Sequence, residues 1–353
     1  MASLLWACQS PTPSPSEEST PPAPDTLNPV YTTDSTRYDS DDPAIWIHPE
    51  DPSKSLILGT DKDADGALYV YNLKGEVQEA LVVRGLKRPN NVDVEYGLLR
   101  KDTQAFYDIA VVAERYTEKL RVFSLPDMQA IDDGGIPVFV DEQPDEFRAP
   151  MGIALYKHPT TGAIYAVVSR KNGPTDKYLW QYELTVDETG IVRGQVVRQF
   201  GAFSGTGEIE AVFVDDALGH IYYSDEGAGI RQYQALVGPN EEDAELALFG
   251  LENFQEDREG ISLYPTSDST GYLLVSDQQA NQFHVYQREG ATHPLLAEIN
   301  VRTNESDGSE ATAIPLGDEY PAGLFVAMSD NKTFQIYDWR EFAKAILKQE
   351  KHD

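Results

Sequence analysis

The chain has 353 residues, with 59 acidic residues against 28 basic ones and a formal net charge of −31. This charge disfavours nucleic acid and anionic membranes as partners through bulk electrostatics, and it makes cations the natural counterpart. A wholly disordered acidic chain is excluded too, because 41% of the residues are hydrophobic and can form a core.

The first residues resemble the end of a bacterial export signal. Leu5-Trp6-Ala7-Cys8 is similar to the lipobox at which lipoproteins are cleaved and acylated on cysteine, with an accidental match as the alternative. The following residues, 9–30, are rich in Pro, Ser, Thr and Glu, which suits a tether. We therefore expect a truncated signal or lipobox remnant over 1–8 and a disordered linker over 9–38. The protein would be exported, as a periplasmic or outer-membrane lipoprotein or in secreted form, with a lipid anchor as its only membrane contact.

From Asp41 onward the sequence reads as short β-type runs separated by turn residues. The runs come in triplets, which begin at positions 44, 92, 152, 211, 261 and 311, and their period of roughly 50 to 60 residues is near that of propeller blades. Radial stacking is the arrangement that buries the faces and edges of such blades. We therefore predict an all-β fold, a six-bladed β-propeller over 39–353, with outer strands in stretches such as 75–83 or 192–200. A short amphipathic helix over 338–347 is expected as a C-terminal cap.

Acidic residues recur just before the expected first strand of five of the six blades. Because first strands line the axial channel of a propeller, these carboxylates would converge and would need cations among them. Hard oxygen ligands in this number favour calcium over zinc, whereas the alternative is that the acids cap turns or face water. The residues at these positions are Asp41 and Asp42, then Asn90, Asn91 and Asp93, then Met151, then Glu208 and Glu210, then Asp257 and Glu259, and then Asp307 and Glu310.

A second series of charged residues follows the expected second strands. Blades one to three carry cations there and blades four to six carry acids, so one rim of the mouth would be basic and the opposite rim acidic. That polarity suits a phosphate group held between basic side chains and metal ions, although a plain surface role for each cation stays open. The cations are Lys62, Arg115, Arg170 and Lys171, and the acids include Glu226.

Sequence signatures of a protein nucleophile are missing. The histidines show no Arg-His-Gly-x-Arg segment, no Gly-x-Ser-x-Gly elbow is present, and the single cysteine, Cys8, precedes the expected fold and allows no intrachain disulfide. A water molecule activated by metal ions is what remains, and such chemistry with calcium would favour neutral to alkaline pH.

Taken together, these segments resemble the β-propeller phytases, the alkaline, 3-phytase-like family, over residues 39–347. The resemblance implies a calcium-dependent phosphomonoester hydrolase that releases inorganic phosphate from phytate (myo-inositol hexakisphosphate) or calcium phytate, with several calcium ions as cofactor; we expect a monomer. The matching segments are Asp41-Asp-Pro-Ala-Ile-Trp46, Asn90-Asn-Val-Asp93, Glu210 to Asp216, Asp257-Arg-Glu-Gly260, Asp307-Gly308 and Glu319 to Ala327.

Residue roles follow from the resemblance position by position. It implies catalytic roles for Glu210, Asp257 and Glu259, and a phosphate clamp of Lys62, Arg115 and Lys171, with Arg170 added from its place on the same rim. The chain departs from the family pattern at Asp63, Met151, Ser309 and Glu310. The implied calcium ligands are Asp41, Asp42, Glu210, Glu226, Asp257, Glu259, Asp307 and Glu310.

Two other classes remain as alternatives at this stage. One is a calcium-dependent lactonase-type hydrolase on a similar scaffold, which usually centres on one axial calcium and needs no basic rim. The other is a propeller without enzymatic activity that binds a protein or another ligand at its mouth.

Overall fold

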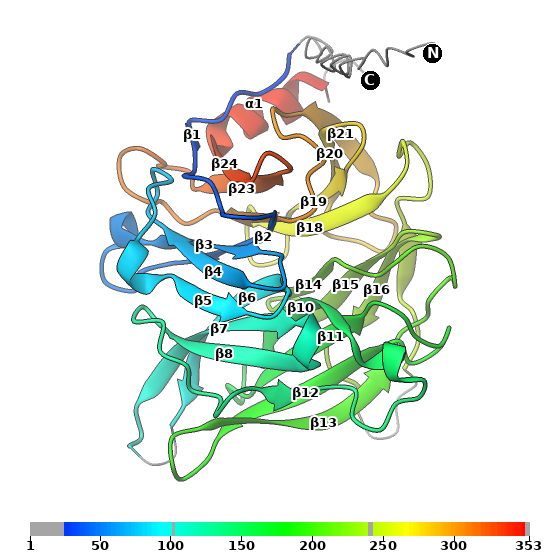
Figure 1. Cartoon of the computed structure of the whole chain (residues 1–353). Coiled ribbons are helices and arrows are strands. Elements are labelled where there is room, and N and C mark those ends of the chain that lie inside the picture. Colours follow the sequence, from blue (N-terminus) through cyan, green and yellow to red (C-terminus); the bar gives the residue numbers. More distant parts are fainter. Residues whose placement is uncertain (1–24, 101–102, 239–242, 350–353) are drawn as a thin grey trace, which may run out of the picture.

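The computed structural model describes residues 25–100, 103–238 and 243–349, and the strands in these ranges form six four-stranded antiparallel sheets arranged around one axis (Figure 1). The innermost strands of neighbouring sheets contact one another in ring order, from β2 through β6, β10, β14, β18 and β22 back to β2. The predicted six-bladed β-propeller is therefore confirmed.

Each blade is built from an inner strand at the axis and three strands outward from it. Blade 1 consists of β2 (Ser40–Trp46), β3 (Leu56–Asp61), β4 (Gly66–Tyr71) and β5 (Val83–Leu86). Blade 2 consists of β6 (Pro89–Leu99), β7 (Phe106–Glu114), β8 (Lys119–Leu125) and β9 (Ile136–Pro137). Blade 3 consists of β10 (Pro150–Lys157), β11 (Ile164–Arg170), β12 (Leu179–Val186) and β13 (Val192–Phe200). Blade 4 consists of β14 (Val212–Asp215), β15 (His220–Asp225), β16 (Gly229–Gln234) and β17 (Ala247–Phe249). Blade 5 consists of β18 (Arg258–Pro265), β19 (Gly271–Asp277), β20 (Gln282–Gln287) and β21 (Leu295–Asn300). Blade 6 consists of β22 (Ser309–Thr312), β23 (Leu324–Ser329), β24 (Thr333–Asp338) and β1 (Tyr31–Thr32). Short 3₁₀ turns lie at Pro52–Lys54, Glu79–Leu81, Arg115–Thr117 and Asp145–Arg148.

The core is a ring of apolar layers between the blades. The described residues form six hydrophobic clusters, each shared by two neighbouring blades. Strands that are covered on both faces read as nearly continuous apolar runs, and β3 and β23 are buried at every position. This packing explains why the sequence shows short, unbroken apolar runs more clearly than strict alternation.

The sixth blade is closed by residues from the N-terminal side of the chain, which we had expected to be linker. Tyr31 and Thr32 pair with Ile336 and Gln335 of β24, and the Tyr31 hydroxyl donates a hydrogen bond of 2.6 Å to Glu319. The expected disordered linker over 9–38 is therefore too long at its C-terminal end. Strand β1 is only two residues long, so its sequence gave no periodic signal. The expected lipobox at Cys8 lies outside the described residues.

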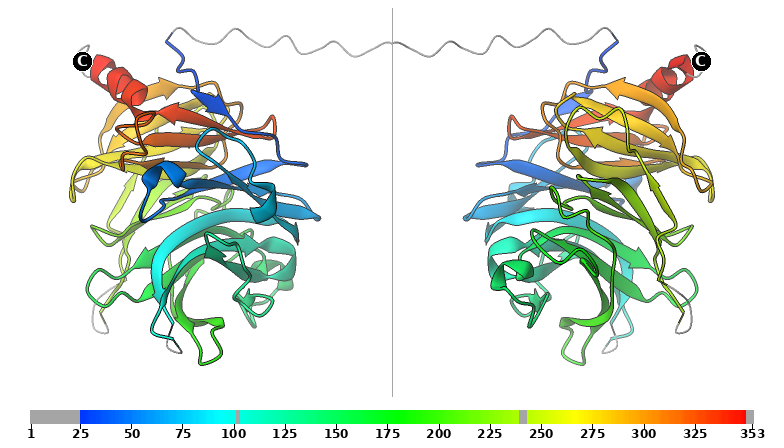
Figure 2. Two further views of the ribbon diagram at one scale, coloured as in Figure 1. Left: turned by 90° about the vertical axis from the view of Figure 1, so that its left-hand side faces the viewer. Right: turned by 90° about the vertical axis from the view of Figure 1, so that its right-hand side faces the viewer.

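The predicted C-terminal helix is present as α1 (Trp339–Gln349) and packs on the outside of blades 5 and 6 (Figures 1 and 2). Its buried residues, Trp339, Phe342 and Ile346, join the apolar cluster between these blades, and the Trp339 ring stacks on Tyr264 with centroids 3.5 Å apart. The helix therefore covers the edge of the apolar layer where the chain ends.

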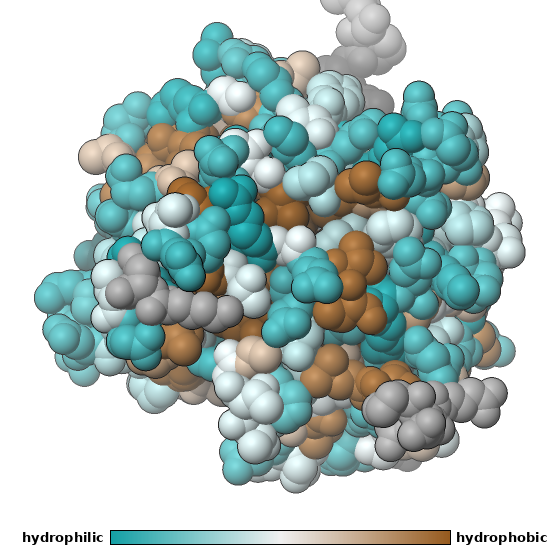
Figure 3. All heavy atoms as spheres, turned by 90° about the horizontal axis from the view of Figure 1, so that it is seen from below, coloured by the Kyte–Doolittle hydropathy of each residue, from teal (hydrophilic) through white to brown (hydrophobic). Residues whose placement is uncertain are grey.

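The face shown in Figure 3 is largely hydrophilic, with separate hydrophobic patches. Phe106 and Tyr116 are among the exposed large side chains. Among the described residues, no helix is both long and apolar enough to span a bilayer.

The closure by β1 predicts a sharp boundary for N-terminal truncation. A chain that starts at residue 25 should keep the melting temperature of the full chain. A chain that starts at residue 38 loses the β1–β24 pairing and should melt about 5 °C lower or more, since each kcal/mol shifts the midpoint by a few degrees in a protein of this size. Equal melting temperatures for the two truncations, measured by circular dichroism, would contradict a stabilising role for β1.

Candidate active site at the acidic mouth

The inner strands all begin at one end of the channel, which we call the acidic mouth and which contains Asp41, Glu210, Glu259 and Asp307. Four of these strands shift register near that end, as a β-bulge does. Bulges turn consecutive side chains away from simple alternation. The shifts fall between Ser40 and Pro43, Pro89 and Val92, Pro150 and Ile153, and Arg258 and Ile261.

Glycines allow neighbouring inner strands to approach closely at the acidic mouth. The Gly260 amide donates to the Asp307 carbonyl at 2.5 Å, and the Gly308 amide donates to the Asp41 carbonyl at 3.1 Å. A Cβ atom at Gly308 would collide with Asp42, and one at Gly260 would collide with the Asp307 backbone. These contacts bring the acidic residues of blades 5, 6 and 1 together.

The ammonium group of Lys62 lies at the centre of the carboxylates. It follows β3 directly and contacts Asp41 Oδ1, with Asp307 Oδ2 at 3.3 Å and Glu210 Oε1 at 3.7 Å. The side chain of Asn90 donates to Glu210 Oε1 at 2.9 Å. Groups from blades 1, 2, 4 and 6 therefore meet around one cation.

The proton affinities of these groups reflect their crowding. Burial and the neighbouring carboxylates of Glu210 and Asp307 raise the pKa of Asp41, despite the opposing charge of Lys62. Burial, followed by the same two neighbours, also raises the pKa of Glu259. For Lys62, burial alone would lower the pKa, but Asp41, Glu210 and Asp307 outweigh it and raise the pKa instead. The carboxylates of the mouth therefore need positive charge to remain ionised.

A second acidic group adjoins the first on the side of blades 4 and 5. Burial and the charges of Asp257 and Glu210 raise the pKa of Glu226 to about 7. Glu226 Oε2 accepts a hydrogen bond from the Glu208 amide at 2.9 Å, and Asp257 Oδ2 accepts one from Gln279 Nε2 at 2.7 Å. Glu259 links the two groups, since its charge interacts with Glu210 and Asp307 on one side and with Glu226 on the other.

Basic side chains from blades 2 and 3 lie beside these acids. Burial, followed by repulsion from Arg115, lowers the pKa of Lys171, which also interacts with Glu210 and Glu226 and contacts Glu208. Arg115 lies against the sulfur of the buried Met151, and its Nε atom is buried without a hydrogen-bond acceptor among the described residues. Two of the predicted clamp residues, Arg115 and Lys171, thus lie together next to the carboxylates.

Arg170, by contrast, is not brought to the mouth. Its side chain is fully buried, with Nε donating to the Tyr178 carbonyl at 2.9 Å and Nη1 to Glu142 at 2.7 Å. It also stacks over Phe139, with its guanidinium carbon 4.3 Å from the ring centroid. A residue that contacts substrate must reach the surface of the mouth, and the buried side chain of Arg170 does not. It instead holds the neighbouring loops together through its hydrogen bonds.

Asp42 and Glu310 separate from the other predicted ligands and point into the channel. Asp42 accepts a hydrogen bond from the Val92 amide at 3.0 Å, and Glu310 accepts one from the Ala311 amide at 2.8 Å. Together with Asp93 they line a narrow space of about 30 Å³ below the mouth. The eight predicted metal ligands therefore form two sets, one at the mouth and one deeper in the channel.

Sequence reasoning missed three polar residues of the mouth. Arg88 precedes β6 and adds positive charge next to Arg115 and Lys171. Gln278 donates to Asp307, and Gln279 donates to Asp257 and accepts from the Asp257 amide at 2.9 Å. Arg88 was detectable from its place two residues before Asn90, whereas single glutamines carry no comparable signal.

The acidic mouth suits a hard cation by its donor chemistry. Carboxylate oxygens, aided by amide oxygens, are the ligands that calcium prefers, and Lys62 holds a positive charge where they converge. Within the described ranges, no three Asp, Glu, His or Cys side chains already surround one point as metal ligands do.

Comparisons with known proteins agree with this picture. The chain is similar to 3-phytase from Bacillus subtilis (strain 168), with 28% identity over 329 residues that cover 87% of this chain and 81% of the relative. A solved structure of hydrazine synthase from Kuenenia stuttgartiensis matches with a TM-score of 0.50 and 11% identity, covering 85% of this chain and 83% of the other, which shows the fold alone. The family model described as Phytase matches residues 17–351, almost the whole chain, and the protein therefore belongs to the phytase family.

Proposed function

We propose that the acidic mouth removes phosphate groups from phytate and that calcium ions are its cofactor. The observation that carries this proposal is the convergence of Asp41, Glu210 and Asp307 on one positive charge, directly beside the cations of blades 2 and 3. Family membership makes the protein a phytate-hydrolysing enzyme and disfavours the lactonase and binding-module alternatives.

Charge explains why such a site would depend on added cations. Phytate is a polyanion, and the protein itself carries a formal net charge of −31, so substrate and mouth repel each other. Arg115, Lys171 and Arg88 supply positive charge on one side only. Several bound calcium ions would reverse the sign on the other side and let a phosphate group lie between metal ions and basic side chains.

The mouth carboxylates divide naturally into roles. Asp41, Glu210, Glu259 and Asp307 would hold calcium where Lys62 now lies, and Glu226 and Asp257 would hold it on the adjoining side. Calcium bound there supplies Lewis acidity, which favours ionisation of a water molecule and offsets negative charge on the phosphate oxygens. Gln278 and Gln279 orient Asp307 and Asp257 through their side-chain amides.

Lys62 would act in two ways. Without calcium its ammonium group balances Asp41, Asp307 and Glu210, which stabilises the crowded carboxylates. When a metal ion takes over that balance, the flexible side chain becomes available to bind a phosphate oxygen on the side of Arg115. Asp63, next in sequence, is held in a turn by the Asp65 amide at 3.0 Å and adds no cation.

We also propose that the protein is exported and anchored through Cys8 or secreted, and that it acts as a monomer. Support for export and anchoring comes from the lipobox-like Leu5-Trp6-Ala7-Cys8 and the Pro- and Ser-rich segment after it.

The main test is phosphate release from phytate between pH 7 and 8. Release should depend on calcium, fall at least about tenfold on chelation, and recover when calcium is restored, because the metal supplies several kcal/mol of charge stabilisation. Glu210→Gln should weaken both calcium binding and turnover. Undiminished release after complete chelation would refute the calcium proposal.

The raised pKa values predict how stability depends on pH without calcium. Burial, with the nearby Glu210, raises the pKa of Asp307 from 3.8 to about 6, and Glu226 is raised from 4.5 to about 7. The folded chain therefore holds protons that the unfolded chain has released, so stability is greatest below about pH 4 for these groups and is lost as pH rises through 6 to 7.

In the presence of a chelator, the melting temperature should accordingly fall between pH 5 and pH 8. The free energy of unfolding should decrease by at most roughly 1.4 kcal/mol per pH unit for each such group, for example Asp307. Excess calcium should remove most of this fall because the metal replaces the protons. The double variant Asp307→Asn with Glu226→Gln should flatten it as well. If the melting temperature in chelator stayed constant from pH 5 to pH 8, the raised pKa values of these carboxyl groups would be contradicted.

The basic side of the mouth can be tested residue by residue. Arg115→Ala and Lys171→Ala should each lower kcat/KM for phytate about tenfold to a hundredfold, since each removes a charge-assisted hydrogen bond to phosphate. Lys74→Ala, at an exposed lysine of blade 1, is the matched control and should change little. Arg170→Gln should instead lower the melting temperature, because it leaves Glu142 and buried carbonyls unpaired. Normal turnover in both clamp variants would refute their assignment.

A further inference from the structure

A second and larger cavity lies at the other end of the channel, which we call the opposite chamber. Its volume is about 690 Å³, within the range of small-molecule sites in proteins. It is lined by the far ends of inner strands from blades 1, 2, 4, 5 and 6, including Ile45, Tyr96, Phe213, Leu263 and Ile314. These side chains give it mainly apolar walls, and Glu310 is the one implied calcium ligand among its described lining residues, which include none of the catalytic or clamp residues.

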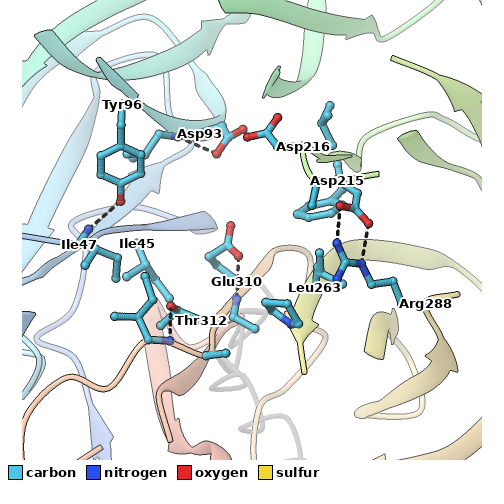
Figure 4. Close-up of a pocket in the computed structure, with 18 of the residues that line it drawn as sticks. Ile45, Ile47, Asp93, Tyr96, Asp215, Asp216, Leu263, Arg288, Glu310 and Thr312 are labelled. Atoms are coloured by element: carbon cyan, nitrogen blue, oxygen red, sulfur yellow. Dashed lines mark hydrogen bonds and ion pairs between the residues drawn. The ribbon is translucent and has the colours of Figure 1, made fainter. Parts of the chain in front are cut away.

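Carboxyl groups form the polar part of the opposite chamber. Figure 4 shows Asp93 and Asp216 with their carboxyl groups near each other and Glu310 pointing toward the middle of the space. Asp93 is oriented by the amides of Val94 and Leu155, both at 2.6 Å. Asp216 accepts a backbone hydrogen bond from Lys157 at 3.0 Å and shares a side-chain hydrogen bond with Glu95. Glu310 accepts one backbone hydrogen bond, from Ala311 at 2.8 Å, which leaves an oxygen for another donor.

The nearby cations are already committed to other groups. Arg288 binds both carboxylate oxygens of Asp215 at 2.7 Å, and its Nη1 donates to the Ser267 and Thr270 carbonyls at 2.8 and 3.1 Å. Lys157 donates through Nζ to the Tyr96 carbonyl at 2.5 Å. Among the described residues, no side-chain cation forms an ion pair with Asp93, Asp216 or Glu310. The chamber therefore combines apolar walls with carboxyl groups that no described side-chain cation pairs.

We propose that the opposite chamber binds a small organic cation, an ammonium group carried on an apolar or aromatic body. The ammonium group would lie among Asp93, Asp216 and Glu310, where charge attraction is strongest. The apolar body would pack against Ile45, Leu263 and Ile314, and the ring faces of Tyr96 and Phe213 offer cation–π contact. A bare metal ion would use the carboxyl groups but would leave most of the apolar wall in contact with water.

This site is separate from the proposed hydrolytic site, and the proposal does not depend on that function. The narrow space of about 30 Å³ between the two ends is too small to hold an organic ligand. A ligand would therefore enter from the end opposite the acidic mouth. Phytate, as a polyanion, would be repelled there, so the two ends of the channel select ligands of opposite charge.

The test uses benzyltrimethylammonium as the probe and full-length protein in excess calcium, so that the acidic mouth is already supplied with cations. Isothermal titration and saturation-transfer NMR should detect binding of the probe, whereas the neutral benzyl alcohol should bind about tenfold more weakly and benzoate should not bind, given an attraction worth roughly 1.4 kcal/mol. No binding of the probe at 10 mM, or equal binding of the neutral compound, would overturn the proposal.

Variants locate the binding. Asp216→Asn should weaken the probe about tenfold, and Ala217→Arg, at an exposed residue of the chamber wall, should weaken it further by placing a cation beside Asp216. Ala244→Arg, the same change at an exposed residue on the outer side of blade 4, should leave the affinity unchanged. If Ala217→Arg does not fold, Asp216→Asn alone decides. Weaker binding in Glu226→Gln but not in Asp216→Asn would place the probe at the acidic mouth and refute the proposal.

Discussion

The close approach of the inner strands at one end of the channel is the constraint on which the site depends. Gly260 and Gly308 permit it, because a side chain at either position would collide with the neighbouring blade. The same approach forces Asp41, Glu259 and Asp307 into a space too small for their separate hydration. Fold and electrostatics are therefore linked, because the crowded carboxyl groups must be balanced by the charge of Lys62 or neutralised by protons.

This constraint also explains what the sequence could and could not predict. The triplets of apolar runs identified six blades, because each strand is covered on both faces and its composition reflects that burial. The acids before the inner strands were identifiable as a set because they recur at the same place in successive blades. Strand β1 was missed because two residues, Tyr31 and Thr32, show no periodicity, and their pairing with β24 depends on the closure of the whole ring.

Side-chain direction was the main feature that the sequence left open. Asp41 and Asp42 are adjacent and chemically equal, yet the register shift between Ser40 and Pro43 sends one toward Lys62 and the other toward the amide of Val92 in the channel. Arg170 and Lys171 are likewise adjacent at the end of β11, and only Lys171 reaches the mouth. Position in the repeat thus determined which blade and which end a residue belongs to, whereas local backbone geometry determined what it faces.

The two ends of the channel illustrate how one set of strands can support opposite chemistry. At the acidic mouth, basic residues after the second strands of blades 1 to 3 complement the acids, and under the proposed function an anion would bind there together with metal ions. At the far end the corresponding turns supply no free cation among the described residues, since Arg288 is held by Asp215. Carboxyl groups and apolar side chains line the chamber together, which is why we propose an organic cation as its ligand. The space between these ends, about 30 Å³, is too small to hold an organic ligand.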